Sequence, residues 1–569
     1  MASSSSDSTP PFFQSLLQKK IIAPPEKHGE NSLNRVLTTF DLTSLGVAAI
    51  IGAGIFSTIG NASFNGGPAI SILFIVMAIA CVFTALCYAQ FASTVPVSGS
   101  AYTYAYVSLG EMTAWMIGWA LILEYAVSNM VVAISWSEYF TSMLSGFGLH
   151  VPEYLAMDFG TASKSFADVQ AALASGKPLS DFPSSVLTAA KAYESAPSFL
   201  GLKFIADFPA LLIVLLITAL VYVGIKESRT ASNALVVFKV GVIIFVIVAG
   251  VFFVTPENWT PFAPNGVGGV LSGVAAVFFA FIGFDSVSTT AEECKDPQRD
   301  LPKAMIYSLI ICTVLYVAIT MVLTGMVPYK ELGVSDPLAY VFAKVGMHFI
   351  SGVIAVSAVV AITSAILVYQ LGQPRIWMAM SRDGLLPKIF SRIHPKYKTP
   401  DFSTILTGFL VGVPALFLNM QVVTDLTSVG TFFAFILVCG GVLVLDPEGK
   451  NTAAKFRVPY VNGQVIIPVL LVLSLAVAFT QMEGYTASFF EKPQQLIFWI
   501  VFFGLAVQSV RLRLSLIPQL GILVNLFLMT ELGVENWIRF LVWVGVGLVI
   551  YFGYGYRNSK LRNESSGKS

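Results

Sequence analysis

Long runs of apolar residues recur along this chain from about residue 40 to about residue 555, and shorter polar stretches separate them. A helix needs about 20 mostly apolar residues to cross the hydrocarbon core of a bilayer. The pattern therefore predicts an all-α polytopic membrane protein with about 14 transmembrane helices. The predicted spans are 40–62, 67–93, 113–143, 203–224, 231–254, 267–288, 304–326, 339–368, 401–419, 422–444, 463–482, 494–510, 515–530 and 534–555.

The composition agrees with a surface that faces lipid. Of the 569 residues, 56% are hydrophobic and only 11% are charged, and the mean hydropathy is +0.77. A soluble domain carries about a quarter charged residues, because water must wet its surface. The formal net charge of +1 also excludes nucleic-acid binding by bulk electrostatics.

The titratable residues show no pattern of the kind that a metal centre or a membrane enzyme requires. The five cysteines have neither metal-ligand nor disulfide spacing. The four histidines are far apart and have few acidic neighbours, at His28, His150, His348 and His394. We therefore expect no metal, no cofactor and no enzymatic activity.

Most lysines and arginines fall in alternate loops, as the positive-inside rule requires of cytosolic segments. This distribution places both termini in the cytoplasm, with a disordered Ser- and Pro-rich tail over 1–35 and a second tail over 557–569. The one sizeable soluble segment, 145–200, then lies outside as a cap. We predict a multi-pass protein of the cell (plasma or inner) membrane.

Glycine interrupts two predicted spans within their apolar runs. The first span reads Ile50-Ile51-Gly52-Ala53-Gly54-Ile55-Phe56, and the sixth reads Phe278-Phe279-Ala280-Phe281-Ile282-Gly283-Phe284-Asp285. Because the two breaks are five spans apart, they predict two inverted five-helix repeats, 36–260 and 261–446. The alternative is that Gly52, Gly54 and Gly283 only let neighbouring helices approach closely.

A broken helix exposes free backbone groups near the middle of the membrane. The N-terminus of a half-helix offers N–H groups to an anion, and unwound carbonyl groups offer acceptors to a cation. Together the two breaks suit a zwitterion, with its carboxylate at the first break and its ammonium at the second.

Three ionisable residues lie inside predicted spans, where such groups are costly and mark function by default. For Lys239 in span five, we favour a proton-coupling role over snorkelling to the interface. For Glu124 in span three, a functional role and a structural one both stay open. Asp285 suits a helix cap or a cytosolic gate better than direct substrate contact.

Aromatic residues surround the second break, at Phe279, Phe281 and Phe284. They could form a lid over a substrate, whereas apolar packing is the ordinary role of a phenylalanine in so apolar a chain.

With these features, the sequence resembles an amino acid permease of the amino acid–polyamine–cation superfamily. It is most similar to the cationic amino acid transporter branch and its bacterial homologues. The resemblance extends over about 400 residues and rests on motifs that are specific in combination. They are GAGIF at 52–56, VSGSAYTY at 97–104, FAFIGFD at 279–285, the cytosolic stretches GQPR at 372–375 and SRDGLLP at 381–387, and TP at 399–400.

The resemblance implies a five-plus-five, LeuT-like inverted-repeat core, with the additional spans 11–14 (447–556) outside it. It implies that backbone amides near Ala53 and Gly54 hold the substrate carboxylate. Ala53 departs from the family pattern, because many relatives carry Ser or Thr there. Lys239 matches a lysine that replaces the sodium ion of sodium-coupled relatives, and Glu124 matches a glutamate of this branch. The carbonyl groups that hold the substrate ammonium match Ile50, Phe279, Ala280 and Ile282.

We therefore predict a proton-coupled secondary transporter that imports L-amino acids, cationic or small neutral, by alternating access. Its partners are the L-amino acid, the proton and the lipid bilayer, with no nucleic acid, and a small membrane subunit stays open. One alternative is an uncoupled facilitator or exchanger. Another is an amino acid sensor that binds its ligand without transporting it.

Overall fold

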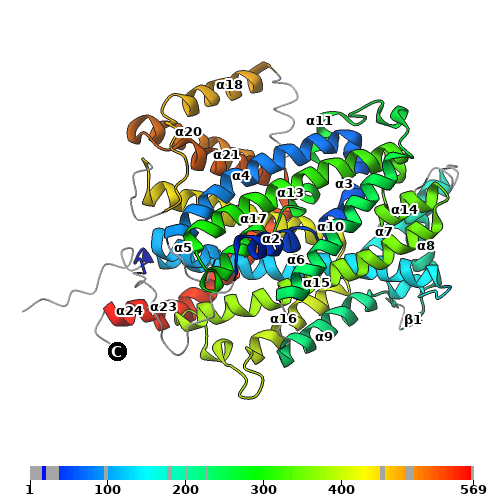
Figure 1. The fold of residues 1–569 in the computed structure, drawn as a ribbon, viewed down its shortest axis with the longest axis horizontal. Helices are drawn as coiled ribbons and strands as arrows, with labels where there is room; N and C mark the ends of the chain where they lie inside the picture. Colours follow the sequence, from blue (N-terminus) through cyan, green and yellow to red (C-terminus); the bar gives the residue numbers. More distant parts are fainter. Residues whose placement is uncertain are drawn as a thin grey trace, which may run out of the picture.

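The computed structural model describes residues 16–20, 37–94, 100–175, 182, 184–199, 202–224, 229–334, 336–448, 455–480 and 492–565, and it is mostly helical (Figure 1). Within these ranges, nine helices are long and apolar enough to cross a membrane, by length and composition. Five shorter apolar helices of 10–17 residues accompany them. The prediction of an all-α polytopic membrane protein is therefore confirmed, while the number of spans and the inverted repeat stay predictions.

The first half of the chain contains the first helix break and a folded loop. Its main helices are α2 (Thr39–Ile50), η1 (Gly54–Thr58), α3 (Ile59–Gly66), α4 (Ile70–Thr94), α5 (Ser100–Ser108), α6 (Glu111–Gly146), α9 (Phe208–Val223) and α10 (Arg229–Val251). Between α6 and α9 lie α7 (Phe159–Ala174), α8 (Ser184–Ser195) and the antiparallel pair of two-residue strands β1 (Ser198–Phe199) and β2 (Leu202–Lys203). The described residues of the segment 145–200 thus form mainly short helices.

The second half begins with the second helix break. Its main helices are α11 (Gly266–Leu271), α12 (Val274–Phe279), η6 (Phe284–Glu293), α13 (Pro297–Met326), α14 (Pro337–Lys344), α15 (His348–Arg382), α16 (Asp401–Ala415) and α17 (Met420–Leu445). The chain continues with α18 (Ile466–Thr480), α20 (Gln495–Leu512), α21 (Leu516–Glu531), α22 (Val534–Ile550), η9 (Tyr551–Gly555), α23 (Tyr556–Asn558) and α24 (Lys560–Ser565).

The predicted span 339–368 was wrong as one continuous helix. The chain forms the short helix α14, turns at Gly346 with a φ of +81°, and then starts α15 at His348. The stretch 372–375, expected in the cytosol, continues α15 as helix, and Pro374 is buried within that helix. Hydropathy did not reveal the turn because apolar residues flank Gly346 on both sides.

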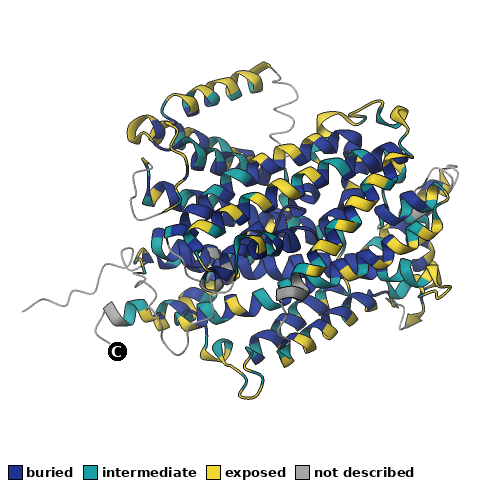
Figure 2. Ribbon diagram, in the orientation of Figure 1, coloured by how far each residue is buried: buried dark blue, intermediate teal, exposed yellow. Residues whose placement is uncertain are grey.

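The core surrounds α6. Every residue of its most apolar 18-residue window is buried, and α15 and α17 form its most extensive contacts. Figure 2 shows buried residues concentrated in these central helices and exposed residues along the outer ones. By contrast, α18 and α20 stand at the edge in Figure 1 and share with α21 a small separate cluster made of Ile467, Leu471, Phe502, Ala506 and Leu523.

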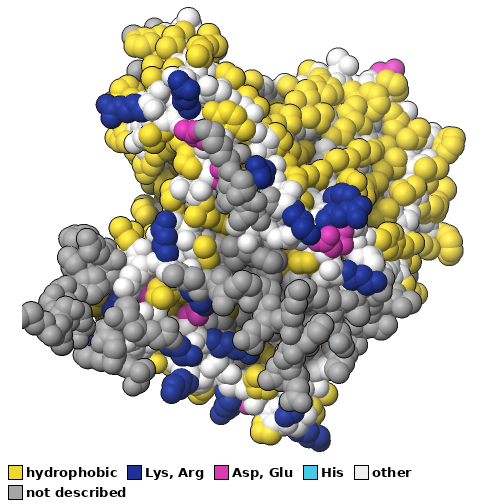
Figure 3. All heavy atoms as spheres, turned by 60° about the vertical axis from the view of Figure 1, so that its left-hand side comes forward, with side chains coloured by type: hydrophobic (Ala, Val, Ile, Leu, Met, Phe, Trp, Pro, Cys, Tyr) yellow, Lys and Arg dark blue, Asp and Glu magenta, His cyan; other side chains and the backbone are white. Residues whose placement is uncertain are grey.

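The surface is divided into an apolar area and a charged area, as a protein embedded in a bilayer requires. Figure 3 shows a broad apolar area on one face, with lysine and arginine side chains along its border and beyond. In Figure 1 the loop helices α7 and α8 lie at one end of the molecule, and α23 and α24 lie at the other. The long helices run between these two ends, as expected of helices that span a membrane.

Candidate functional site

The first helix break lies between α2 and η1. The last hydrogen bond at the end of α2 runs from the N–H of Ile51 to the oxygen of Val47, at 2.9 Å. Ile51 itself is extended, with φ −77° and ψ 90°, and a π-helical turn begins at Gly54. The first N–H groups of a helix have no partner within it, so this turn presents amide donors at the break.

The second break lies between α12 and η6. Two tight turns follow α12, from the N–H of Phe281 to the oxygen of Phe278 at 2.8 Å and from the N–H of Ile282 to the oxygen of Phe279 at 3.2 Å. Gly283 then has a φ of +116°, a conformation that favours glycine, and η6 starts at Phe284.

The two breaks pack against each other through their glycines. A Cβ atom on Gly54 would lie 2.4 Å from the Cα atom of Ala280, and one on Gly283 would lie 2.9 Å from the carbonyl carbon of Ala49. Each break therefore places a glycine against the backbone of the other break. Gly52 differs, because a Cβ atom there would meet only the Cβ atom of Ala365, at 3.4 Å.

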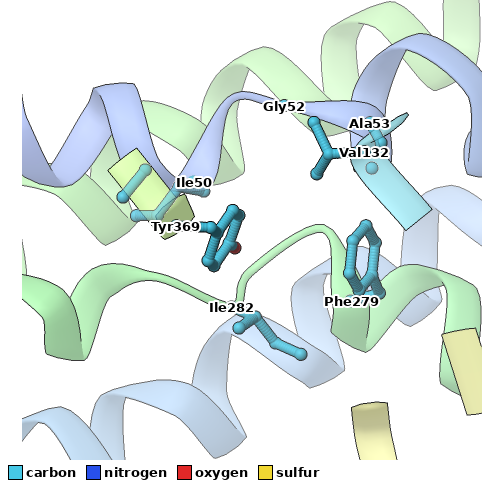
Figure 4. Close-up of a pocket in the computed structure, with 9 residues that line it drawn as sticks. Ile50, Gly52, Ala53, Val132, Phe279, Ile282 and Tyr369 are labelled. Atoms are coloured by element: carbon cyan, nitrogen blue, oxygen red, sulfur yellow. The ribbon is translucent and has the colours of Figure 1, made fainter. Parts of the chain in front are cut away.

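A cavity lies between the breaks (Figure 4). About 10 Å³ of it is open to the centres of water molecules, which is room for roughly one water. Figure 4 shows the ring of Phe279 from the second break and the ring of Tyr369 from α15 at the cavity, whereas the side chain of Ile282 extends away from the first break. The lining residues are Ala49, Ile50, Gly52, Ala53, Gly54, Val132, Phe279, Ile282 and Tyr369.

Sequence reasoning missed three of these residues, Ala49, Val132 and Tyr369. The first two are ordinary apolar residues in apolar runs, so no sequence signal distinguishes them. Tyr369 directly follows the predicted end of span eight, and it joins the site because α15 continues to Arg382.

Of the three phenylalanines considered as a lid, only Phe279 lines the cavity. Phe281 packs edge-on against Phe74 and Tyr316. Phe284 packs against aromatic rings of α4 and α17. Packing is therefore the role that the geometry supports for Phe281 and Phe284.

Tyr316 of α13 ties the two breaks together. Its hydroxyl oxygen lies 3.0 Å from the carbonyl oxygen of Ile50 and 2.8 Å from that of Ala280. These are two of the carbonyl groups that the resemblance assigned to the substrate ammonium. The only sequence signal was a tyrosine in the middle of an apolar run, which names no partner.

Lys239 of α10 lies beside the first break. Its side chain is 1% exposed, and its Nζ atom donates to the carbonyl oxygens of Ala48 at 3.3 Å and Ile51 at 3.2 Å. The amine thus binds the end of α2. Snorkelling to the interface was the alternative, and it does not fit a buried amine held by these two carbonyls.

Glu124 and Asp285 are both buried but stand outside the cavity lining. One carboxyl oxygen of Glu124, Oε2, has no hydrogen-bond partner among the residues that the structure describes. Glu124 is within electrostatic range of Asp285. Asp285 is the second residue of η6 and is buried, and the N-cap position of that helix is Gly283, without a side-chain capping hydrogen bond.

No metal centre accompanies this site within the described ranges. There, no group of three or more His, Cys, Asp or Glu side chains comes together as a metal ion would need.

Comparison with known proteins gives matches along almost the whole chain. The amino acid permease family matches residues 37–506, and the C-terminal region of amino acid permeases matches residues 514–559. The branched-chain amino acid permease BcaP of Bacillus subtilis (strain 168) is 38% identical over 534 residues, covering 94% of this chain and 96% of the relative.

Two further relatives are named for other substrates. The methylthioribose transporter of Bacillus subtilis (strain 168) is 36% identical and covers 96% of this chain and 100% of the relative. The vacuolar cationic amino acid transporter 2 of Arabidopsis thaliana is 31% identical, covering 97% of this chain and 94% of the relative. These relatives are named as permeases or transporters and not as enzymes. The chain belongs to the amino acid permease family of multi-pass membrane transporters.

Proposed function

We propose that this protein is a proton-coupled transporter that imports L-amino acids across the plasma membrane by alternating access. The observation that carries the proposal is the convergence of two broken helices on one small cavity. Both termini and the alternate loops that carry most of the lysines and arginines lie in the cytoplasm on this proposal, as the positive-inside rule favours. The reciprocal glycine contacts between the breaks favour two inverted repeats, 36–260 and 261–446, with 447–556 outside them.

The backbone of the two breaks binds the ends of the amino acid. The substrate carboxylate accepts hydrogen bonds from amides at Ala53 and Gly54, where the positive end of the helix dipole of η1 also lies. The ammonium donates to carbonyl oxygens at Ile50, Phe279 and Ile282, whose residues line the cavity. Ala280 contributes less than the sequence predicts, because it is not among the residues that line the cavity.

The lining favours a neutral, apolar substrate side chain. Apart from Tyr369, the cavity is bounded by apolar residues and glycines, and Glu124 is not among them. An unpaired cationic side chain would be costly there, because burying a charge without a partner loses its hydration. The branched-chain specificity in the name of BcaP agrees with this choice.

The cavity must enlarge to admit a substrate, since it now has room for roughly one water molecule. The closing contacts are short and reciprocal, between Gly54 and Ala280 and between Gly283 and Ala49. Small displacements of the two breaks therefore open or close the site, which suits an occluded stage of alternating access.

Lys239 senses the proton. In its charged form the amine donates strong hydrogen bonds to Ala48 and Ile51, and loss of the proton removes a donor and the charge. The end of α2 then loses part of its attachment to α10. This step connects the protonation of Lys239 to the position of the first break.

Uptake by purified protein in proteoliposomes tests the proposal. We expect an inward proton gradient to drive accumulation of radiolabelled leucine, and a protonophore to abolish that accumulation. Excess unlabelled valine or alanine should compete, whereas arginine, lysine and methylthioribose should compete poorly. Flux that ignores the protonophore would favour an uncoupled facilitator or exchanger, and leucine binding without flux would favour a sensor.

The role of Lys239 is tested by two substitutions. K239A should abolish gradient-driven uptake while keeping measurable binding, and K239R should give uptake that no longer depends on pH, because its charge is permanent. K344A is the matched control, since Lys344 is half-exposed and pairs with Glu331 on the surface. Undiminished gradient-driven uptake by K239A would refute the coupling role.

A further inference from the structure

A second cavity lies at the start of α13, away from the helix breaks. Its volume of about 470 Å³ falls within the range of about 300–1,000 Å³ that small-molecule sites occupy. One wall is a single face of α13, and the other is the short segment that precedes α18. Its lining residues are Asp296, Gln298, Arg299, Pro302, Lys303, Ile306, Tyr307, Lys455 and Phe456.

Both walls are fixed to the same residue, Ser93 at the end of α4. The Ser93 hydroxyl donates to the carbonyl oxygen of Phe456 at 3.1 Å and accepts from its N–H at 3.0 Å. The carbonyl oxygen of Ser93 accepts from the side-chain amide of Gln298 at 2.9 Å. The groove is therefore preformed, which lowers the ordering cost of binding a ligand.

The groove carries an excess of positive charge. Arg299, Lys303 and Lys455 face one carboxylate, that of Asp296. Lys455 lies 3.6 Å from Asp296, and both side chains are well exposed, at 64% and 43%, so this pair is weak. Arg299 and Lys303 form no ion pair with any other residue that the structure describes, which leaves two positive charges available to an anion.

The same face of α13 turns apolar beyond the charged end. Tyr307, Ile310, Ile311 and Val314 continue it and are 48%, 53%, 39% and 64% exposed. At 1.5 Å per residue, Lys303 and Val314 are about 17 Å apart along the helix. That length is close to one leaflet of a hydrocarbon core about 30 Å thick.

We propose that this groove binds an anionic phospholipid, with its phosphate between Arg299 and Lys303 and its acyl chains along α13. A guanidinium group matches the oxygens of a phosphate in a two-point contact, and a lysine adds a compact charge. Basic pockets at the membrane boundary are the sites where proteins select anionic headgroups. The apolar track explains why the ligand is a lipid and not a soluble phosphate.

Native mass spectrometry of the delipidated full-length protein tests this proposal. We titrate it with phosphatidylglycerol or phosphatidylcholine of the same chain length. The wild-type protein should bind the first lipid in preference to the second. The double variant R299Q/K303Q should bind phosphatidylglycerol about 30-fold more weakly, which corresponds to about 1 kcal/mol for each cation lost.

The matched control is K388Q/K396Q, which removes two exposed lysines from another loop. It should bind phosphatidylglycerol as the wild-type protein does. Equal thermal stability of the two double variants without lipid would show that both fold. The proposal is overturned if the wild-type protein does not distinguish the two lipids, or if R299Q/K303Q keeps wild-type binding. A last outcome would show that the site binds a soluble phosphate and not a lipid, and it too would overturn the proposal. In that outcome, inorganic phosphate raises the melting temperature of the wild-type protein as much as phosphatidylglycerol does, and it has no such effect on R299Q/K303Q.

Discussion

The contact between the two helix breaks predicts that G54A is far more harmful than G52A. Both substitutions add one methyl group, and the two positions are two residues apart. At Gly54 the new carbon would lie 2.4 Å from the Cα atom and 2.7 Å from the Cβ atom of Ala280. At Gly52 it would lie 3.4 Å from the Cβ atom of Ala365, which is close to an ordinary van der Waals contact.

The size of the effect follows from what has to move. Ala280 belongs to the second break and its backbone cannot rotate away as a long side chain can, so the two breaks must separate. Overpacking of a tightly packed core costs about 1–3 kcal/mol. If all of that cost fell on the form that binds substrate, binding would weaken by about 5-fold to 150-fold. G52A should change it by less than about 3-fold, because its neighbour needs to shift little or not at all.

The assay measures leucine binding to purified protein by scintillation proximity, together with uptake into proteoliposomes and the melting temperature. We expect G54A to lose both binding and uptake, and G52A to retain both. If G54A binds leucine with wild-type affinity while its melting temperature falls, the contact serves packing alone. That result would refute the assignment of the breaks as the substrate site.

Three further predictions concern groups around the core. Y316F should raise the KM for uptake and lower the melting temperature, because the single O–H donor that the buried carbonyl groups of Ile50 and Ala280 share is lost, at a cost of about 1–3 kcal/mol; an unchanged KM would contradict this. Burial raises the pKa of Asp336, which precedes α14, to about 6. The folded protein therefore holds this proton more tightly than the unfolded chain does. As the pH rises from about 4 to about 6, the free energy of unfolding should fall by up to about 3 kcal/mol. D336N should flatten that part of a melting-temperature profile, and a profile identical to wild type would refute the assignment. R562A should strongly lower the melting temperature, since it leaves the fully buried carboxylate of Glu111 without its cation, a loss of about 3–5 kcal/mol for such pairs; R557A, in α23, is the control.

The sequence predicted those parts of the site that interrupt a pattern. Gly52, Gly54 and Gly283 stand out because glycine within an apolar run breaks the regularity of a spanning helix. Lys239 stands out because charge is rare there. The turn at Gly346 did not, since hydropathy stays high on both sides of it.

Tertiary contacts account for the rest of what the sequence left open. The hydroxyl group of Tyr316 lies between two carbonyl oxygens that are 266 and 36 residues away in the sequence, and no local pattern encodes either pairing. Val132 reaches the cavity because α6 runs beside η1, where Tyr139 of α6 donates to the carbonyl oxygen of Phe56. Phe281 and Phe284 carry the same local signal as Phe279, and only the direction of each side chain separates lining from packing.

The carbonyl groups at the end of α2 explain how one helix end can respond to both proton and substrate. The carbonyl oxygen of Val47 accepts a hydrogen bond from the N–H of Ile51. The Lys239 amine donates to the oxygens of Ala48 and Ile51, and the Tyr316 hydroxyl lies within hydrogen-bond distance of the oxygen of Ile50. A carbonyl oxygen accepts two hydrogen bonds, so the oxygen of Ile50 can serve a substrate ammonium while Tyr316 stays in place. On the proposed mechanism, substrate adds a donor to this end of α2 and loss of the Lys239 proton removes one. Both ligands therefore act on the position of the same helix, and coupling needs no direct contact between them.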